Sequence, residues 1–158
     1  TVFRVELAFD RMEEKEKTEA ESEALAGKRL LLAEDDRLCG EILCELLEDE
    51  TGRPVSIAAN GRAALEMFES ANGEYDAIIM DVQMPVMNGY EAARAIRRSG
   101  CGNAKTVPII ALTADASEES ARSAADSGMN GCLAKPVNID RLRKAVDDDL
   151  KSLSVAYR

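Results

Sequence analysis

The sequence contains no histidine, and this absence excludes several kinds of chemistry. Without an imidazole the chain cannot use histidine as a general base, form a Ser-His-Asp triad or itself carry phosphohistidine. The cysteines form no Cys-x-x-Cys pair, so a zinc site is not expected either. We interpret the four cysteines as reduced thiols of a cytoplasmic protein, mostly small buried side chains: Cys39, Cys44, Cys101 and Cys132.

Long hydrophobic runs and an excess of positive charge are also missing. No apolar run approaches the ~18 residues that a membrane-spanning helix needs, and no signal-peptide pattern opens the chain. The net charge of −10 would repel a nucleic-acid backbone. We therefore expect no nucleic-acid partner and no membrane contact by this segment. An acidic chain of this kind is better suited to a divalent cation or to a basic partner surface.

The 158 residues suffice for one compact domain and a tail. Residues 1–9, TVFRVELAF, alternate apolar and polar side chains with a period of two, which predicts a half-buried strand. Residues 10–27 are rich in charge and nearly free of large apolar side chains, so we predict a solvated linker. The numbering starts at Thr1 rather than at a methionine, and we expect an excerpt of a longer protein.

From Lys28 onward, short apolar strands alternate with amphipathic helices. Five such units predict a parallel sheet that helices cover on both faces, with right-handed connections. Apolar side chains of the first predicted helix recur at spacings of three and four and should line one face. The fourth helix, from about Ser117, offers only alanines to its neighbours and should be held loosely. The expected strands are 29–34, 55–59, 75–81, 107–113 and 131–135, and the first helix face comprises Cys39, Ile42, Leu43, Leu46 and Leu47.

Charged or polar side chains stand at the carboxyl ends of four of these strands. In an open parallel sheet such ends meet at one edge, where the functional crevice lies. Carboxylates that lie close together raise each other's pKa unless a cation sits between them, and Mg²⁺ suits such a site. A lysine and a hydroxyl beside them would hold the oxygens of a phosphoryl group. Each residue alone is more often a cap or a turn residue, and only the combination predicts a site. The strand ends are Glu34-Asp35-Asp36, Asp81, Thr113 and Lys135.

The acid pair, MPVMNGYE after Asp81, ALTA around Thr113 and LAKP around Lys135 resemble the receiver domain of two-component response regulators. The resemblance implies a flavodoxin-like (βα)5 fold over residues 28–154, a doubly wound α/β structure with five parallel strands in the order 2-1-3-4-5. It also implies that Asp81 accepts a phosphoryl group from phosphohistidine, whose oxygens Thr113 and Lys135 then hold. Conformational switching and self-dephosphorylation would follow. Such a domain is not a separate enzyme, because it catalyses only its own phosphorylation and dephosphorylation.

The same resemblance implies a set of ligands for Mg²⁺. Asp35, Asp81 and the backbone carbonyl of Gln83 would bind the ion directly, and Glu34 would act through water. The phase of the first helix supports this choice of acids, because it leaves Asp36 in the outer loop.

The implied partner is a histidine kinase or a His-containing phosphotransfer domain. The wording MDVQMPVMNGYEA and ALTADA is most like receivers attached to hybrid sensor histidine kinases, and residues 1–9 resemble the last strand of a kinase ATP-binding domain. The parent kinase can be membrane-anchored. The 1–9 strand and the face of the fourth helix are the candidate surfaces for self-association. Cys132 stands where the family usually has Tyr or Phe, so the usual coupling of the threonine to an aromatic ring is not expected here.

Two other interpretations stay open at this point. A hydrolase of the haloacid-dehalogenase kind also uses a strand-end Asp with Mg²⁺, Thr and Lys, but it has a second Asp two residues later, where this chain has Gln83. A receiver-like interaction module that never takes phosphate would share the fold, although such modules usually lack one of the site residues. A flavodoxin-type cofactor binder is excluded, because Glu34-Asp35-Asp36 after the first strand would repel a phosphate.

Overall fold

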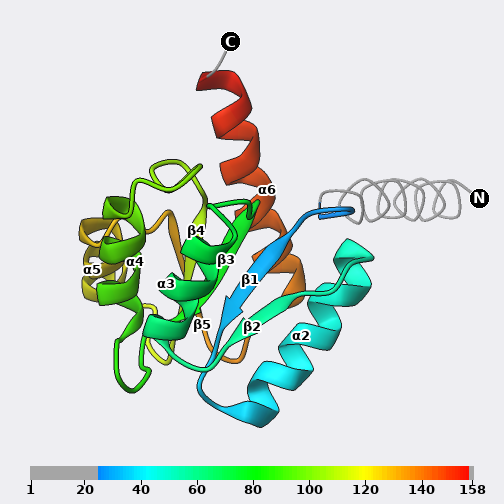
Figure 1. Ribbon diagram of the computed structural model, residues 1–158. Helices are drawn as coiled ribbons and strands as arrows, with labels where there is room; N and C mark the ends of the chain where they lie inside the picture. Colours follow the sequence, from blue (N-terminus) through cyan, green and yellow to red (C-terminus); the bar gives the residue numbers. More distant parts are fainter. Residues whose placement is uncertain (1–24, 157–158) are drawn as a thin grey trace, which may run out of the picture.

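A five-stranded parallel sheet forms the centre of the molecule in the computed structural model, which describes residues 25–156 and their side chains up to residue 153. The strands lie in the order β2-β1-β3-β4-β5 (Figure 1). The predicted flavodoxin-like architecture and its 2-1-3-4-5 order are therefore confirmed. The strands are β1 (Leu30–Ala33), β2 (Ser56–Ala58), β3 (Ala77–Asp81), β4 (Ile109–Thr113) and β5 (Gly131–Ala134).

The three central strands, β1, β3 and β4, are buried along their whole length. Their composition follows from this position, because a strand covered by helices on both faces carries apolar residues without alternation. The edge strands β2 and β5 are partly exposed. The most deeply buried C-terminal strand ends are therefore those of the central strands β1, β3 and β4.

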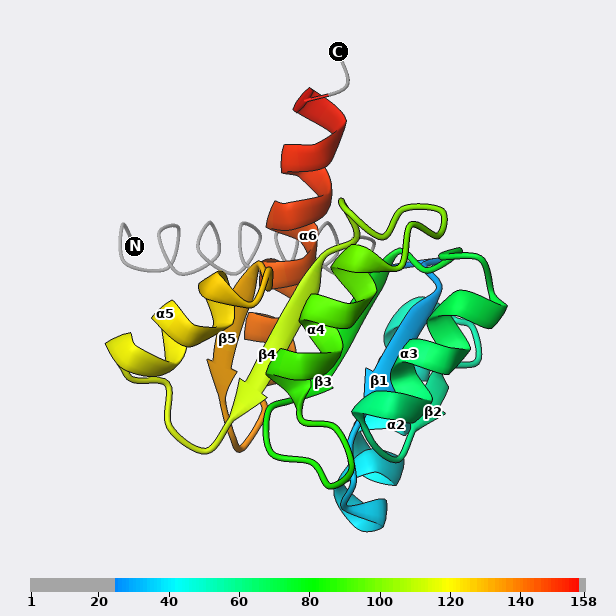
Figure 2. The ribbon, with the colours of Figure 1, turned by 60° about the vertical axis from the view of Figure 1, so that its left-hand side comes forward.

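Helices cover both faces of the sheet. Figure 2 shows α3 and α4 in front of the sheet with α5 beside them, whereas α2 and α6 pack on the opposite face. An Asp, Asn or Ser side chain accepts a backbone N–H at the start of α2, α3, α4 and α5, which fixes where each helix begins. The helices are α2 (Arg37–Thr51), α3 (Gly61–Ser70), α4 (Gly89–Arg98), α5 (Glu118–Asp126) and α6 (Ile139–Ala156).

The apolar face of α2 is only half covered, a detail that the predicted helix face did not specify. Leu43 and Leu47 are buried, but Cys39, Ile42 and Leu46 are exposed, Ile42 by 53%. The apolar stripe of α2 is wider than the surface that the sheet and α6 offer it, so its outer edge stays in water. This edge becomes important beside the functional site.

The cysteines have free thiols, as expected, but they are not buried. Cys39 is exposed, and Cys44, Cys101 and Cys132 are half-buried. The expectation of mostly buried thiols was wrong because these residues occupy the outer side of α2, the loop after α4 and the edge strand β5. Cys44, Cys101 and Cys132 pack against the core from its periphery.

Helix α5 is held mainly by polar contacts at its C-terminal end. Only Ala124 of this helix is buried, in agreement with the predicted lack of apolar surface. Arg94 donates from Nη1 to Ser127 Oγ over 3.1 Å, and Arg97 donates from Nε to the carbonyl of Gly128 over 2.9 Å. The two arginines of α4 therefore fix the C-terminal end of α5.

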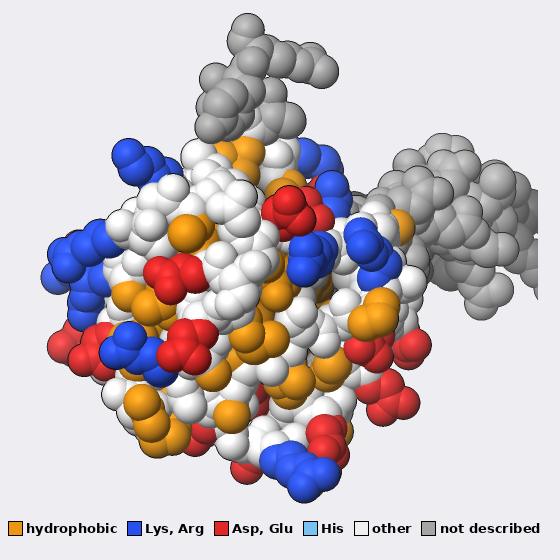
Figure 3. Space-filling model, in the orientation of Figure 1, with side chains coloured by type: hydrophobic (Ala, Val, Ile, Leu, Met, Phe, Trp, Pro, Cys, Tyr) orange, Lys and Arg blue, Asp and Glu red, His pale blue; other side chains and the backbone are white. Residues whose placement is uncertain are grey.

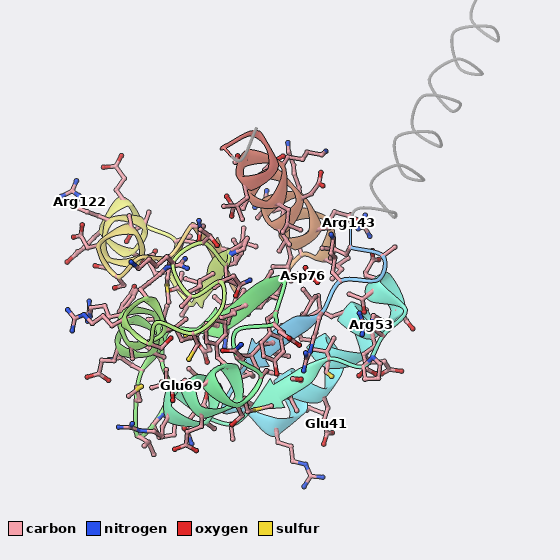
Figure 4. The ribbon with its side chains drawn as sticks, turned by 45° about the horizontal axis from the view of Figure 1, so that its top comes forward. Glu41, Arg53, Glu69, Asp76, Arg122 and Arg143 are labelled. Carbon is pink, nitrogen blue, oxygen red and sulfur yellow. The ribbon has the colours of Figure 1, made fainter. Side chains whose placement is uncertain are left out.

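A bidentate ion pair joins α6 to α2. Arg143, labelled in Figure 4, donates from Nη2 and Nε to the two carboxylate oxygens of Glu50 over 2.6 and 2.7 Å, and from Nη1 to Asp140 over 3.1 Å. The Arg143 side chain is almost fully buried. Because fork-to-carboxylate geometry satisfies both groups, this pair fixes how α6 lies against α2.

We expect Arg143→Ala to lower the free energy of unfolding by about 3 kcal/mol, because the Glu50 charge would stay largely buried without its partner. Urea unfolding followed by circular dichroism measures this change. Arg141→Ala on the exposed side of the same helix is the matched control and should stay within about 0.5 kcal/mol of the wild type. Equal changes in both variants would show that the ion pair of Arg143 with Glu50 contributes nothing of its own to stability.

Part of the predicted linker belongs to the folded unit. Leu25 lies in the core beside α2 and α6, and Gly27 N donates to the carbonyl of Thr51 over 2.8 Å. The predicted strand of residues 1–9 and the rest of the linker lie outside the described residues. Figure 1 shows that α6 extends beyond the sheet at the end where β1 begins. No described helix is both long and apolar enough to cross a bilayer.

Candidate functional site

Parallel pairing brings the predicted site residues to one edge of the sheet. Glu34 follows β1 at the level of Asp81, the last residue of β3. Thr113 ends β4, and Lys135 directly follows β5. Hydrogen bonds continue the sheet past the strands, because Glu34 N donates to Ala58 O over 3.0 Å and Lys135 N donates to Thr113 O over 2.7 Å. The backbone of each site residue is therefore fixed by the sheet itself.

Three carboxylates form a compact cluster at this edge. One carboxylate oxygen from each of Glu34, Asp35 and Asp81 lies within 4.8 Å of the other two. Glu34 is buried, Asp81 is only 5% exposed, and Asp35 is exposed. Asp36 lies outside the cluster, as predicted, and its Oδ1 accepts the N–H of Cys39 at the start of α2 over 2.8 Å. The acid pair is thus Glu34 and Asp35.

Lys135 pairs with two members of the cluster. Its Nζ lies 2.9 Å from Glu34 Oε2 and 3.0 Å from Asp81 Oδ2. Partial burial lowers the pKa of Lys135, but the hydrogen bonds to Glu34 and Asp81 outweigh this effect and raise the pKa above its ordinary value. The ammonium therefore stays charged and neutralises part of the cluster.

Asp81 is a weaker acid than a free aspartate. Burial raises the pKa of Asp81 to about 6, and the negative charge of Glu34 acts in the same direction. The hydrogen bond from Lys135 and the N–H of Gln83, which donates to Asp81 Oδ1 over 3.2 Å, lower the pKa but do not cancel the rise. A carboxylate in this state gains stability from any additional cation.

The raised pKa of Asp81 predicts a pH-dependent difference between the wild type and Asp81→Asn without divalent ions. A carboxyl whose pKa rises on folding stabilises the fold fully below its unfolded value near 4, and this contribution is lost as the pH rises through about 6. Asparagine mimics the protonated form at every pH. The variant should therefore gain about 2 kcal/mol over the wild type between pH 4.5 and pH 7.5 in urea unfolding. A difference that does not change with pH would contradict the raised pKa.

The hydroxyl of Thr113 does not touch Asp81 in this structure. It donates to the carbonyl of Asp115 over 3.1 Å and accepts the N–H of Asp115 over 3.3 Å. The sheet thus places Thr113 at the predicted edge, but its side chain belongs to the turn before α5. A rotation that breaks both bonds would be needed before the hydroxyl meets a group on Asp81.

Two glycines hold the loop after β3 close to the site. A Cβ at Gly89 would collide with the carbonyl oxygen of Asp81, and a Cβ at Gly61 would collide with the carbonyl oxygen of Met87. Gly61 N donates to that Met87 oxygen over 3.0 Å, and Gly89 N donates to Val82 O over 2.9 Å. Only glycine permits this approach, so the Asn-Gly turn secures the loop next to Asp81.

The donor set fits a hard divalent ion. The described residues that gather at this edge offer carboxylate and backbone oxygens, with neither a thiol nor an imidazole among the three clustered ligands. Such oxygen ligands suit Mg²⁺. The hydrogen bond from Gln83 N to Asp81 keeps the Gln83 backbone beside the cluster, where its carbonyl was predicted to serve.

A groove beside the acidic cluster was not predicted from the sequence. It has a volume of about 510 Å³ and runs between α2 and the segment after β5. The signal that points to it is the width of the α2 stripe, whose outer residues have no partner in the described part of the chain. The groove is lined mainly by Cys39, Ile42, Leu46, Pro136 and Val137, with Glu34 and Lys135 at its polar end.

Comparison with known proteins places this arrangement in a family. The chain is 36% identical over 148 residues to the probable histidine kinase 2 of Oryza sativa subsp. indica, a match that covers 86% of this chain and 14% of the rice protein. The chain therefore spans a small fraction of the length of this relative.

Solved structures of separate receiver domains match nearly over their full length. The receiver domain of the sensor histidine kinase PA1611 from Pseudomonas aeruginosa PAO1, with a magnesium ion coordinated in its active-site cleft, is 36% identical, with a TM-score of 0.65 and coverage of 80% of this chain and 99% of that chain. The receiver domain of Saccharomyces cerevisiae Ssk1, in complex with the histidine phosphotransfer protein Ypd1, is 32% identical, with a TM-score of 0.68 and coverage of 77% and 88%.

Residues 30–147, which include the acidic cluster, Thr113 and Lys135, match the family model of the response regulator receiver domain. The fold and the order of the strands agree with this match. The chain therefore belongs to the response regulator receiver domain family of two-component signalling.

Proposed function

We propose that Asp81 is the phosphoacceptor of this receiver domain. The observation that carries the proposal is the position of its carboxylate. Asp81 is almost fully buried at the end of the central strand β3, 3.0 Å from the Lys135 ammonium and close to the Glu34 and Asp35 carboxylates. Burial of a carboxylate destabilises the folded state, and such perturbed acids are found mainly at functional sites. Nucleophilic attack on phosphorus is a function that a carboxylate in this position can perform.

The transfer proceeds by displacement at phosphorus. A carboxylate oxygen of Asp81 forms a bond to the phosphorus atom of phosphohistidine while the P–N bond breaks, and the imidazole leaves with its electron pair and takes a proton. Lys135 neutralises the phosphoryl oxygens, and the Thr113 hydroxyl reaches them after leaving Asp115. Dephosphorylation is the attack of water on the same phosphorus atom, which releases phosphate and restores the Asp81 carboxylate.

We propose Glu34, Asp35, Asp81 and the carbonyl of Gln83 as the groups that hold Mg²⁺, with Glu34 acting through water. When bound, the ion supplies positive charge that offsets the carboxylates and the phosphoryl oxygens. The fit of the acidic cluster and the magnesium ion in the Pseudomonas receiver support this proposal.

The direct test is to incubate the full chain with acetyl phosphate and Mg²⁺ and to measure its intact mass. We expect one phosphoryl group per chain, and none when EDTA removes the metal. Absence of the adduct while Mg²⁺ still binds would favour the interaction-module interpretation. Continuous turnover of acetyl phosphate far beyond the small release expected of an unstable acyl phosphate would favour the hydrolase interpretation.

We infer that the phosphodonor is a His-containing phosphotransfer domain or a histidine kinase that docks along the groove beside α2. The complex of a similar receiver with Ypd1 supports a partner of this class. The exposed apolar side chains Ile42 and Leu46 line the groove, which leads to Glu34 and Lys135 at the site. A partner surface that covers them would bring its phosphohistidine to the acidic cluster while removing apolar area from water.

Ile42→Ser is expected to slow phosphotransfer from phosphorylated Ypd1 by about tenfold, because part of the apolar docking surface is lost. Gel-based transfer kinetics at sub-saturating donor measure this rate. Ile57→Ser is the matched control, since Ile57 is similarly exposed (43%) but lies on the edge strand β2 and does not line the groove. Equal effects of the two substitutions would argue against docking at this groove.

We further infer that the parent protein is a hybrid histidine kinase and that this domain works in the cytoplasm. The similarity to the rice kinase and the free thiols support the two inferences. In that setting residues 1–9 would belong to the end of the kinase core and residues 10–27 to the linker. The domain itself would catalyse only its own phosphorylation and dephosphorylation.

A further inference from the structure

Four asparagines of this chain are followed directly by glycine, a pair of residues that can deamidate without an enzyme. The backbone nitrogen of the glycine attacks the side-chain carbonyl carbon (Cγ) of the asparagine, ammonia leaves, and a five-membered succinimide ring forms. Glycine favours this step because it has no side chain to obstruct the approach. The asparagine side chain must rotate toward that nitrogen, so a side chain held elsewhere is protected. The four pairs are Asn60-Gly61, Asn72-Gly73, Asn88-Gly89 and Asn130-Gly131.

Three of these asparagines are held by hydrogen bonds of their side chains. The Oδ1 atoms of Asn60 and Asn88 accept backbone N–H groups at the starts of α3 and α4 over 2.8 and 2.9 Å. The Oδ1 atom of Asn130 accepts two hydrogen bonds, from Ile109 N and from Arg97 Nη2, each over 2.9 Å. These bonds must break before the side chain can turn toward the glycine nitrogen, which slows the attack.

The side chain of Asn72 lacks this protection. Asn72 lies in the turn after α3, where its side chain is exposed and makes no hydrogen bond with any residue that the structure describes. Its φ angle of +51° lies in the left-handed region, which only a few residues other than glycine adopt. The N–H of Gly73 donates to a carbonyl, as the N–H groups of Gly61 and Gly89 do, so the attacking nitrogens do not distinguish the sites. The free side chain sets Asn72 apart.

We propose that Asn72 is a modification site, at which deamidation produces aspartate or isoaspartate. Water opens the succinimide at one of its two carbonyls. Addition at the former side-chain carbonyl yields aspartate, and addition at the main-chain carbonyl yields isoaspartate, in which the backbone runs through the former side chain. The net reaction takes up one water molecule and releases one ammonia molecule, with no oxidation or reduction. Figure 3 shows acidic side chains spread over the visible face, and the product adds a negative charge to a chain whose net charge is −10.

Isoaspartate at this position would disturb a close contact between two loops. A Cβ at Gly102 would collide with the carbonyl oxygen of Asn72. A Cβ at Gly73 would lie only 3.0 Å from the carbonyl oxygen of Cys101. The turn after α3 and the loop after α4 therefore meet backbone to backbone. Isoaspartate inserts one extra carbon atom into the main chain of the turn, and this contact leaves no room for it, so we expect the isoaspartate form to be less stable.

The test incubates the full chain at mildly alkaline pH and follows each Asn-Gly pair by peptic digestion at acid pH and mass spectrometry. Deamidation replaces the NH₂ group with OH. We expect the Asn72 peptide to show this mass change at least about tenfold faster than the other three, because one hydrogen bond of a side chain corresponds to roughly that factor. An isoaspartyl methyltransferase should then methylate the Asn72 peptide. Asn72→Gln is the matched variant and should not react, since glutamine must close a larger ring.

Thermal unfolding tests the expected effect on the contact between the loops. The midpoint of the wild type should fall by at least about 2 °C during the incubation, because part of the chains then carry isoaspartate. The midpoint of Asn72→Gln should not change over the same period. Equal changes in the two proteins would show that modification of Asn72 does not disturb the contact.

Two other outcomes overturn the inference. Equal rates at the four pairs, or faster reaction at one of the hydrogen-bonded asparagines, would show that the side-chain bonds do not control deamidation. A synthetic peptide of residues 68–77 supplies the rate without the fold. If the peptide deamidates fully while Asn72 of the intact chain stays unmodified, the turn itself protects Asn72 and the proposed site does not exist.

Discussion

Asp81→Asn is expected to lower Mg²⁺-dependent phosphorylation by acetyl phosphate at least about 10³-fold, which leaves no measurable adduct. The amide oxygen of asparagine carries no negative charge and does not form a stable acyl phosphate. The substitution preserves the shape of the side chain and the acceptor for the Gln83 N–H, so the fold should persist. Removal of the raised-pKa carboxyl should even stabilise the metal-free protein near neutral pH.

Intact mass spectrometry of the wild type and the variant, each with and without EDTA, measures this effect. Asp36→Asn is the matched control, because Asp36 is an adjacent acid outside the cluster and asparagine caps a helix equally well. The control should label like the wild type. If Asp81→Asn took up a phosphoryl group at the wild-type level, the acceptor would be another residue and the proposed role of Asp81 would be wrong.

Lys135→Met is expected to slow phosphorylation by roughly 10²–10³-fold, the range seen when one preorganised electrostatic donor is removed from an active site. Methionine keeps much of the length of the side chain but removes the charge that lies 2.9 Å from Glu34 and 3.0 Å from Asp81. The three carboxylates would then face each other without this cation. The pKa of Asp81 should rise further, because the hydrogen bond from Lys135 is among the effects that lower it.

The further rise in the pKa of Asp81 should make phosphorylation of Lys135→Met more dependent on pH than that of the wild type. The variant should label faster at pH 8.5 than at pH 6.5 by a larger ratio than the wild type, because more of its Asp81 is protonated at the lower pH. Lys144→Met, an exposed lysine of α6, is the matched control and should leave both rates unchanged. A uniform slowing of Lys135→Met at both pH values would show that Lys135 acts on the phosphoryl group without tuning Asp81.

Much of the fold could be predicted because its signals are local. Continuous apolar runs predicted the buried strands, and their alternation with amphipathic helices predicted the parallel sheet. Local patterns do not show how much surface a neighbour offers, which is why they could not predict that the outer half of the α2 stripe stays exposed. The partnership of Arg143 with Glu50 has no sequence signal either, since 93 positions separate the two residues.

The positions of the candidate site residues could be predicted from the sequence, but the orientations of their side chains could not. The carboxyl ends of parallel strands share one edge of the sheet, and this rule alone predicts that Glu34, Asp81 and Lys135 lie close together. The orientation of the Thr113 hydroxyl toward Asp115 was not foreseeable, because it depends on the turn that leads into α5. The positive φ of Val86 likewise has no sequence signal, since valine is a poor candidate for that conformation.

The attachment of Leu25 beside α2 and α6 has a consequence for the geometry of transfer. Leu25 precedes β1, and α6 extends beyond the sheet at the end where β1 begins (Figure 1). Asp81 is the last residue of β3, which runs parallel to β1, so the acceptor lies at the opposite end of the sheet. A domain joined before Leu25 or after α6 would be attached at the pole opposite the acceptor. A donor joined before Leu25 in the same chain would have to reach past the whole length of the sheet. Transfer within one chain should then depend steeply on tether length, whereas transfer between chains should depend only on concentration.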